Sequence, residues 1–511
     1  MTINRRSFLR GGAFGMGAVA ATTALGRWTR TADAASATRY AGHRSVVAVF
    51  LLGGNDGNQL LVPRDSRHAL YAAARPTIGL TKAELLPIPI GTQTDATASY
   101  GLHPKLQKTQ LAFKAGTAAL VANVGPAALP TLKTDYTNTA HPRPTNLFSH
   151  SDQQDAWSTA VPIPSLVAAA VARAGWGGRL ADLLEGLNPP VASPPVTYPA
   201  MTLVGGRRTF AAGAGLPLVT SASGELTFNP ANTNGFYQLR RDGMADVAGV
   251  TNGVELQQGY GDVLATAAAI AVERTRARTD AWAALASTTR TAIDAAFAAA
   301  SPTWSLPTQL RTVLLDVIAG AVAVANGGLG QRRQVFSVGL GGFDTHNDQR
   351  AAQDALFEQL DFALDAYARA VAALATDPVF AGAPPQSTLF TMSDFARTFT
   401  ENSDGGTDHA WGNHALVLGD RVAGGKIYGG FPNLDVLAAD ATSSTTDSRG
   451  RWIPSTTVEQ YVYSMASWLG VNAAEAAVIF PNHEAYRAAA AARGLGTLYT
   501  RLQHPLMLAD A

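Results

Sequence analysis

The 511-residue sequence contains no cysteine and few charged residues, and both features limit what the protein can be. Without cysteine there is no disulfide, no thiolate metal site and no cysteine nucleophile. Any metal ion must therefore be held by histidine, carboxylate, amide or hydroxyl groups. The 39 lysines and arginines balance the 38 aspartates and glutamates, which excludes a protein that binds nucleic acid through bulk positive charge.

Apolar residues make up 47% of the chain and charged residues 15%, a composition typical of a folded protein rather than a disordered one. The length is sufficient for one large α/β domain or two smaller ones. No obvious linker divides the chain after its first residues. We therefore expect a single domain over residues 35–511.

The N-terminus has the features of an export signal. Arg5 and Arg6 begin the string RRSFLR, and an uncharged stretch of Gly, Ala and Thr follows over residues 11–26. That stretch is short for a bilayer span, and Ala32-Asp33-Ala34 has the small residues that a signal peptidase reads. The pattern resembles a twin-arginine signal peptide over residues 1–34. It predicts a periplasmic or secreted protein that engages the twin-arginine export machinery, the alternative being a chance basic N-terminus on a cytosolic protein.

No later segment has the length and purity expected of a stable membrane span. Short apolar runs closed by glycine or polar residues instead predict buried strands. These runs are Ser45–Leu52, Ala118–Val124, Gln334–Leu340, Ser387–Met392 and Ala415–Gly419.

Helical patterns lie between these strands. Apolar residues recur at helical spacing from Leu356 to Leu374, and Thr456 with Glu459 has capping-box spacing ahead of a helix closed by Gly470. Alternating strands and helices predict an α/β fold with a mainly parallel central sheet covered by helices on both faces. Residues 189–260 are rich in Pro, Gly, Thr and Asn, and we interpret them as an insertion or lid.

Acidic and imidazole side chains stand beside four of the predicted strands. Asp56 follows the first strand, Asp344 and His346 follow the third, and Asp394 follows the fourth. His409 precedes the fifth. Ligands of open α/β sheets bind outside the carboxyl ends of the strands, so the loops after the strands can converge on one crevice. Such a group suits one or two divalent cations, Zn²⁺, Mn²⁺ or Mg²⁺.

Several strings in these regions, FLLGGNDGNQLLVP, GLHPKL, GGFDTHNDQ, TMSDFART and TDHAWGNHALVLG, resemble the DUF1501 family of exported bacterial proteins. The resemblance covers about residues 45–481. It implies an alkaline phosphatase-like fold of the phosphatase and sulfatase superfamily. Members of that superfamily hold one or two metal ions at strand ends and transfer phosphoryl or sulfuryl groups through a Ser, Thr or formylglycine nucleophile. Because the chain has no cysteine, a cysteine-derived formylglycine is excluded.

The resemblance implies that Asp56, Asp344, His346, Asp394 and His409 are metal ligands. Two departures from the superfamily pattern bear on this set. Asp344 and His346 are separated by a single residue where the usual spacing is wider, and Phe395 stands where a Ser-Asp-His-Gly motif has its histidine. One of two metals could therefore be missing or weakly held.

The nucleophile implied by position in the chain is Ser149, with His150 assisting. Ser149 stands just before a predicted helix, whose positive dipole end also favours an incoming anion. We assign Arg397 and His414 to substrate binding, although Arg397 could instead pair with a neighbouring acid and His414 could form hydrogen bonds within its glycine-rich loop.

Each candidate also has a purely structural interpretation. Asp56 could be a turn residue, Ser149 an ordinary N-cap, and Asp344 or Asp394 the start of a helix. Three functions remain open: a metal-dependent hydrolase of phosphate or sulfate esters, a non-catalytic secreted protein that binds a glycan or partner in the same crevice, and a metal-dependent carboxylic esterase. The first predicts a small anionic ester or glycan as substrate and no nucleic-acid partner.

Overall fold

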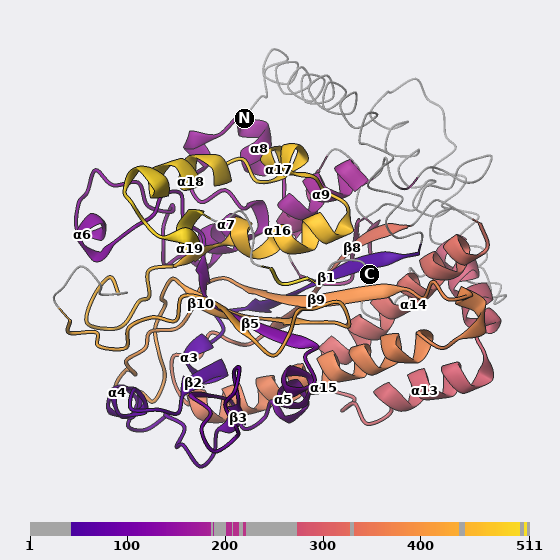
Figure 1. Cartoon of the computed structure of the whole chain (residues 1–511), viewed down its shortest axis with the longest axis horizontal. Coiled ribbons are helices and arrows are strands. Elements are labelled where there is room, and N and C mark those ends of the chain that lie inside the picture. Colours follow the sequence, from indigo (N-terminus) through magenta and orange to yellow (C-terminus); the bar gives the residue numbers. More distant parts are fainter. Residues whose placement is uncertain are drawn as a thin grey trace, which may run out of the picture.

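The structure is a computed structural model that describes residues 42–184, 188, 201–206, 208–213, 218–220, 273–327, 332–438, 445–500 and 505–507. The expected signal peptide, residues 1–34, and most of the expected insertion at 189–260 lie outside the described residues. A sheet of nine strands runs through the middle of the described part and carries helices on both faces (Figure 1).

The order of strands in this sheet is β11-β5-β10-β9-β1-β8-β6-β7, and β12 pairs with β5. The central strands are those that the apolar runs predicted, with ends shifted by a few residues. Their bounds are β1 Arg44–Leu52, β5 Ala118–Gly125, β8 Arg333–Gly341, β9 Gln386–Ser393 and β10 Asn413–Leu418. The outer strands are β6 Met201–Leu203, β7 Leu218–Val219, β11 Ile427–Gly429 and β12 Thr456–Thr457.

Strand β1 pairs in parallel with β8 on one side and β9 on the other. β10 is antiparallel to both of its neighbours, β9 and β5, and the other pairings in this sheet are parallel. The sheet is thus mixed and mostly parallel, and the α/β class with helices on both faces is confirmed.

The side chains of β1 alternate between two cores. Val47, Val49 and Leu51 face one cluster of buried apolar residues, while Val46, Ala48 and Phe50 face another, as the two-residue period of a strand requires. Both faces are apolar because helices cover both, which explains why the run SVVAVFLL is continuously hydrophobic.

Helices α5 Gln107–Lys114, α13 Ser287–Phe297, α14 Ser305–Ala325 and α15 Gln349–Leu374 cover the first face (Figure 1). Helices α9 Trp176–Leu184, α16 Val458–Leu469 and α17 Ala473–Ile479 pack on the second.

The remaining elements include α7 His150–Thr159 and a three-stranded sheet in the order β2-β4-β3. Their bounds are α3 Gly57–Leu60, β2 Leu61–Pro63, α4 His68–Ala74, β3 Leu86–Ile88, β4 Tyr100–Leu102, α6 Lys133–Tyr136, α8 Ala169–Arg173, α10 Arg208–Ala211, α18 His483–Ala492 and α19 Thr497–Thr500, with 3₁₀ turns at Pro164–Leu166 and Pro378–Phe380.

The structure changes three details of the expected organisation. The capping box of α16 is formed by Thr457 and Gln460, one residue beyond the expected pair, because Thr457 is the last extended residue before the helix. The string MTLVGG contributes β6, which extends the main sheet beside β8. Helix α14 is long and apolar enough by composition to cross a membrane, but its apolar side chains are largely buried against the sheet and α15, as in a core helix.

Candidate metal and acid–base site

The strand directions bring the predicted loops together. β1, β8 and β9 are parallel, and their ends lie level, since Leu51 pairs with Ser393 and Leu52 with Gly341. The residues that follow β8 and β9 therefore emerge at one edge of the sheet. Because β10 runs the opposite way, the loop that precedes it reaches the same edge. This is why His409, ahead of a strand, can meet Asp344, which follows one.

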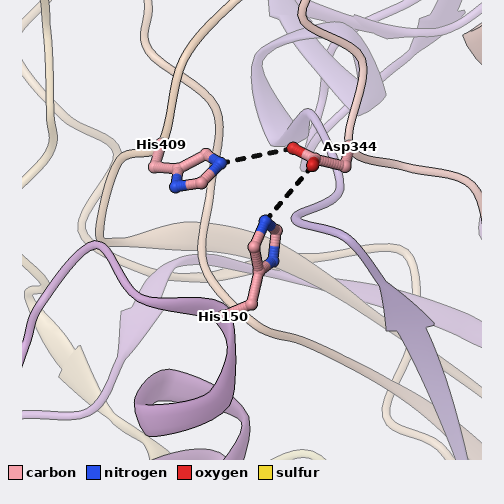
Figure 2. A group of neighbouring side chains, drawn as sticks. All are labelled: His150, Asp344 and His409. Atoms are coloured by element: carbon pink, nitrogen blue, oxygen red, sulfur yellow. Dashed lines mark hydrogen bonds and ion pairs between the residues drawn. The ribbon is translucent and has the colours of Figure 1, made fainter.

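Asp344, His346 and His409 form a close group at this edge. The Oδ1 atom of Asp344 lies 3.0 Å from Nε2 of His346 and 3.3 Å from Nε2 of His409. The two imidazole nitrogens are themselves 3.1 Å apart. His150 approaches from α7, with its Nε2 3.3 Å from the other carboxylate oxygen of Asp344, and Figure 2 shows the His150 and His409 rings directed at that carboxylate.

These separations suit a shared cation. Ligand atoms about 2.0–2.2 Å from one Zn²⁺ lie roughly 3–3.5 Å from one another. Among the described residues, His150, Asp344 and His409 form one group whose possible ligand atoms all lie within 4.8 Å of one another, and Nε2 of His346 lies 3.0 Å from Asp344 and 3.1 Å from His409. The side chain of Asp344 is 44% exposed and that of His409 23%, so the group is open to solvent.

The electrostatics divide the three histidines into two kinds. Partial burial and the charge of Arg397 lower the pKa of His346 and of His409, which favours the neutral imidazoles that bind metals. Partial burial alone would raise the pKa of Asp344, but Arg397 and the imidazoles outweigh it and lower that pKa. The group thus offers two neutral nitrogens and an ionised carboxylate.

His150 behaves differently because Asp394 stands behind it. Its Nδ1 lies 2.7 Å from Oδ2 of Asp394, and this hydrogen bond raises the pKa of His150. Asp394 is fully buried, and its Oδ2 also accepts hydrogen bonds from Gln154 and from the backbone N–H of Gly53. The other oxygen, Oδ1, has no hydrogen-bond partner among the described residues. This arrangement holds the His150 ring in one orientation and favours its protonated form.

Arg397 is buried and connects Asp344 to the interior. Its Nη1 donates to Asp344 Oδ1 at 2.7 Å, and its other nitrogens donate to the hydroxyl and carbonyl of Thr407. Of the two roles left open for Arg397, the structure therefore places it beside a neighbouring acid. Phe395 is also buried, and its ring packs on His150 and His409 with centroids 4.8 and 4.5 Å away.

Asp56 is not part of this group. Its carboxylate is fully buried and pairs with Arg75 at 2.6 Å, while Gln349 and the backbone N–H of Asn58 donate to the same two oxygens. All the described partners of Asp56 are thus internal to the fold, and it also caps α3. The expected ligand role does not fit this position.

Two further expected site residues, His414 and Ser149, form no hydrogen bond or ion pair with the group around Asp344 among the described residues. His414 is buried and stacked on Phe431, and burial lowers its pKa to about 4, so it is a neutral core histidine. Ser149 is the N-cap of α7, where its hydroxyl accepts from the backbone N–H of Asp152 and lies 3.2 Å from the Ser151 hydroxyl. The structure thus brings together His150, Asp344, His346, His409 and Arg397, whereas Asp394, an expected ligand, is buried behind His150 as its hydrogen-bond partner.

Several contributing residues were not anticipated from the sequence. Gln154 follows His150 by four residues on α7, and this helical spacing lets both side chains reach Asp394. Asp408 holds Nδ1 of His346 at 3.2 Å and stands beside His409 in the chain. Arg75 and Gln349, the partners of Asp56, carry no local sequence signal, because they meet it only through tertiary folding.

A cavity of about 570 Å³ adjoins the centre. Phe148 lines it, and the carbonyl oxygen of Phe148 lies 2.8 Å from Nδ1 of His409. Tyr136, His141 and Arg143 also line the cavity, so it combines aromatic surface with a cationic side chain. Phe148 is thus the residue that connects the cavity to the histidine group.

The chain matches the family described as "Protein of unknown function (DUF1501)" over residues 43–448. The protein belongs to the DUF1501 family. The match begins one residue before β1 and includes Asp344, Asp394 and His409. Neither the curated proteins nor the solved structures contain a match to this chain.

Proposed function

We propose that this DUF1501 protein is an exported, metal-dependent hydrolase of phosphate or sulfate esters. The observation that carries the proposal is the group of Asp344, His346 and His409, whose ligand atoms lie 3.0–3.3 Å from one another at an open edge of the sheet. Such a donor set fits one Zn²⁺ or Mn²⁺ ion. When bound, the ion would neutralise negative charge that develops on the ester oxygens.

The protein's own residues supply the proton transfer. His150 is held by Asp394 and has a raised pKa, so it is suited to donate a proton to the leaving oxygen as a water molecule attacks the phosphorus or sulfur and the bond to that oxygen breaks. Its Nε2 faces the carboxylate of Asp344, which places the transferable proton at the ligand group. Asp394 acts through His150 and is a positioning residue.

The surroundings favour an anionic substrate. Arg451 donates to the His409 carbonyl and lies over the Phe148 ring at 4.5 Å, and Arg449 pairs with Asp408. Both arginines also form ion pairs, Arg451 with Asp447 at 2.7 Å and Arg449 with Asp408, and their guanidinium groups add positive charge near the centre that favours an approaching anion. The twin-arginine signal and the alkaline phosphatase-like fold belong to the same proposal, and the fold is supported by the mostly parallel sheet with its ligands at the strand ends.

The experiment begins with chelator-treated protein. Zn²⁺, Mn²⁺ and Mg²⁺ are titrated back, bound metal is measured by mass spectrometry, and turnover is screened on phosphate, sulfate and carboxylate esters. We expect Asp344→Asn to lose metal and turnover together, and Asp394→Asn to keep the metal while turnover falls about 10²–10⁴-fold. Asp404→Asn is the matched control, because Asp404 is an exposed aspartate of the same loop region.

The outcomes separate the three functions considered. Turnover of carboxylate esters alone would replace the proposed chemistry with an esterase. Metal binding with no turnover on any ester class would favour a non-catalytic binding protein. Full turnover in Asp344→Asn would remove the metal-dependent mechanism. The expectation from the sequence that Ser149 is the nucleophile is tested by Ser149→Ala beside Ser151→Ala, since both change the start of α7 but only Ser149 has that expected role.

A further inference from the structure

A second cavity, of about 460 Å³, lies at the opposite edge of the main sheet. Leu389, near the start of β9, and Leu418, at the end of β10, form its inner end. Asp394 follows Leu389 by five residues, or about 16 Å along an extended strand. The cavity is therefore separate from the histidine group and plays no part in the proposed ester hydrolysis.

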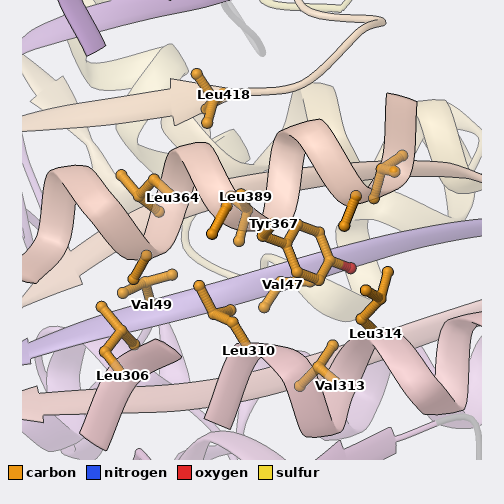
Figure 3. Close-up of a cluster of buried hydrophobic side chains, with 14 of the residues drawn as sticks. Val47, Val49, Leu306, Leu310, Val313, Leu314, Leu364, Tyr367, Leu389 and Leu418 are labelled. Atoms are coloured by element: carbon orange, nitrogen blue, oxygen red, sulfur yellow. The ribbon is translucent and has the colours of Figure 1, made fainter. Parts of the chain in front are cut away.

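Two helices form the walls of this cavity. Leu111 and Ala112 of α5 line one side, and Leu364, Ala368 and Val371 of α15 line the other. Figure 3 shows Leu364 and Tyr367 of α15 near Leu389 and Leu418. Leu111, which lines the cavity, is 65% exposed and adds an apolar side chain to its entrance.

The polar groups inside the cavity are already satisfied. The Tyr367 hydroxyl and the Ser387 hydroxyl are hydrogen-bonded at 2.7 Å, and Ser45 donates to Ser387. The Thr109 hydroxyl donates to Asp361, and that of Thr117 to a backbone carbonyl. The interior thus leaves no strong unmet donor, so the part of a ligand that enters must be apolar.

The rim carries charge. Asp365 and Arg369 form an ion pair at 2.8 Å, and the carboxyl of Asp420, whose pKa burial raises against the opposing charge of Arg421, also lines the cavity. Lys108 also lines the cavity: its ammonium lies over the Phe362 ring at 4.8 Å, its charge acts on the Asp361 carboxyl, and it forms no ion pair with any residue that the structure describes. A lysine that forms no ion pair, beside an apolar cavity, suits an amphiphile with an anionic head.

We propose that this cavity binds the aliphatic chain of a small monocarboxylate, with the carboxylate at Lys108. The apolar walls of α5 and α15 accept the chain, and its size is within the range of small-molecule sites. This ligand is distinct from the ester substrate, and its site does not depend on a metal.

The test uses titration calorimetry on the full-length protein with octanoate, 1-octanol and octylamine, which share one chain length and differ in head-group charge. We expect octanoate to bind about tenfold more tightly than octanol, and octylamine least. Lys108→Gln should remove the advantage of octanoate over octanol while octanol binding stays. Equal binding of the three ligands would overturn the proposal.

Substitutions that fill the cavity provide a second test of the proposal. Ala368→Trp, or Ala112→Phe from the other wall, should abolish octanoate binding, whereas Ala355→Trp on an exposed face of α15 should leave it unchanged. His150→Ala should also leave it unchanged, because that residue lies at the other edge. Octanoate binding that survives in a folded Ala368→Trp protein, or that is lost in His150→Ala, would overturn the assignment.

Discussion

Asp56 and Asp344 both follow strands that end at the same edge of the sheet, yet their surroundings differ completely. Asp344 is half exposed among imidazoles, whereas Asp56 is buried against a guanidinium and an amide. The difference arises from what packs behind each loop. Arg75 from the end of α4 and Gln349 from α15 reach Asp56, and nothing in the string GGNDG specifies either partner.

Asp56→Asn tests this structural role. Removing one partner of a buried ion pair leaves Arg75 uncompensated, so we expect a loss of about 3–5 kcal/mol in the free energy of unfolding. The metal content of the folded fraction should not change. Denaturant unfolding and metal analysis of the same preparation measure both quantities, with Asp404→Asn as the exposed control. Loss of metal with unchanged stability would restore Asp56 as a ligand.

Glu459 gives the stability a pH dependence. Burial raises the pKa of Glu459 to about 8, although the Asn482 hydrogen bond and the charge of Arg179 oppose this. The ordinary value is 4.5, so the folded state binds more protons than the unfolded state between pH 4.5 and 8. The stabilising contribution is complete below pH 4.5 and is lost as the pH rises through 8, with a slope of at most about 1.4 kcal/mol per pH unit.

Glu459→Gln should therefore flatten the fall in stability across that window. Thermal unfolding measured at intervals from pH 5 to pH 8.5 follows the effect. The exposed Glu358, paired with Lys105, is the control residue, since its replacement by Gln should leave the slope as it is. An identical slope in wild type and Glu459→Gln would show that Glu459 does not titrate in the folded protein as described.

At the scale of elements, the sequence correctly predicted a capping box at the start of helix α16 but placed it one residue too early. Both Thr456–Glu459 and Thr457–Gln460 have capping-box spacing, so the sequence alone leaves two registers. Pairing of β12 with β5 keeps Thr456 and Thr457 extended, and the helix begins after them. Gly470, at φ 116°, ends the helix as expected.

Paired Thr→Val substitutions decide between these registers. Thr457→Val removes the hydroxyl that accepts from the Gln460 N–H, and we expect a cost of about 1 kcal/mol. Thr456→Val should cost less, because the Thr456 hydroxyl is buried without a hydrogen-bond partner among the described residues. Denaturant unfolding of the two variants measures the difference. A larger loss in Thr456→Val would support the register predicted from the sequence.

Strand β10 is the element on which the candidate centre depends. Its apolar run predicts a strand, but the direction of that strand is not encoded in the run itself. Running antiparallel, it carries His409 to the carboxyl ends of β8 and β9. In the parallel sense, the same loop would emerge at the opposite edge of the sheet.

On the scale of the whole molecule, two apolar cores share one sheet, and α14 belongs to the first of them. Its Leu310, Val313 and Leu314 pack toward the sheet with α15 (Figure 3). The length and apolarity that make it resemble a membrane span are therefore used within the fold.

Leu314→Ala should consequently destabilise the entire domain by about 2–5 kcal/mol, because it opens a cavity between α14 and the sheet. Calorimetric unfolding measures the change. Leu437→Ala, at a leucine that is 78% exposed, should have little effect. Equal losses in both variants would contradict the placement of α14 in the core.

The apolar runs by themselves determined that this protein is α/β and where its central strands lie, because strand formation and two-sided burial depend on local periodicity. They also indicated Asp344, His346, Asp394 and His409, since polar residues just outside buried strands stand at the edges of a sheet. His150 and Arg397 were also named from the sequence, but only the tertiary structure gave their contacts with Asp394 and Asp344, and it placed Asp56 and His414 outside the group. These outcomes depend on strand direction and on partners hundreds of residues apart, and the physical cause is long-range packing, which a local sequence pattern does not specify.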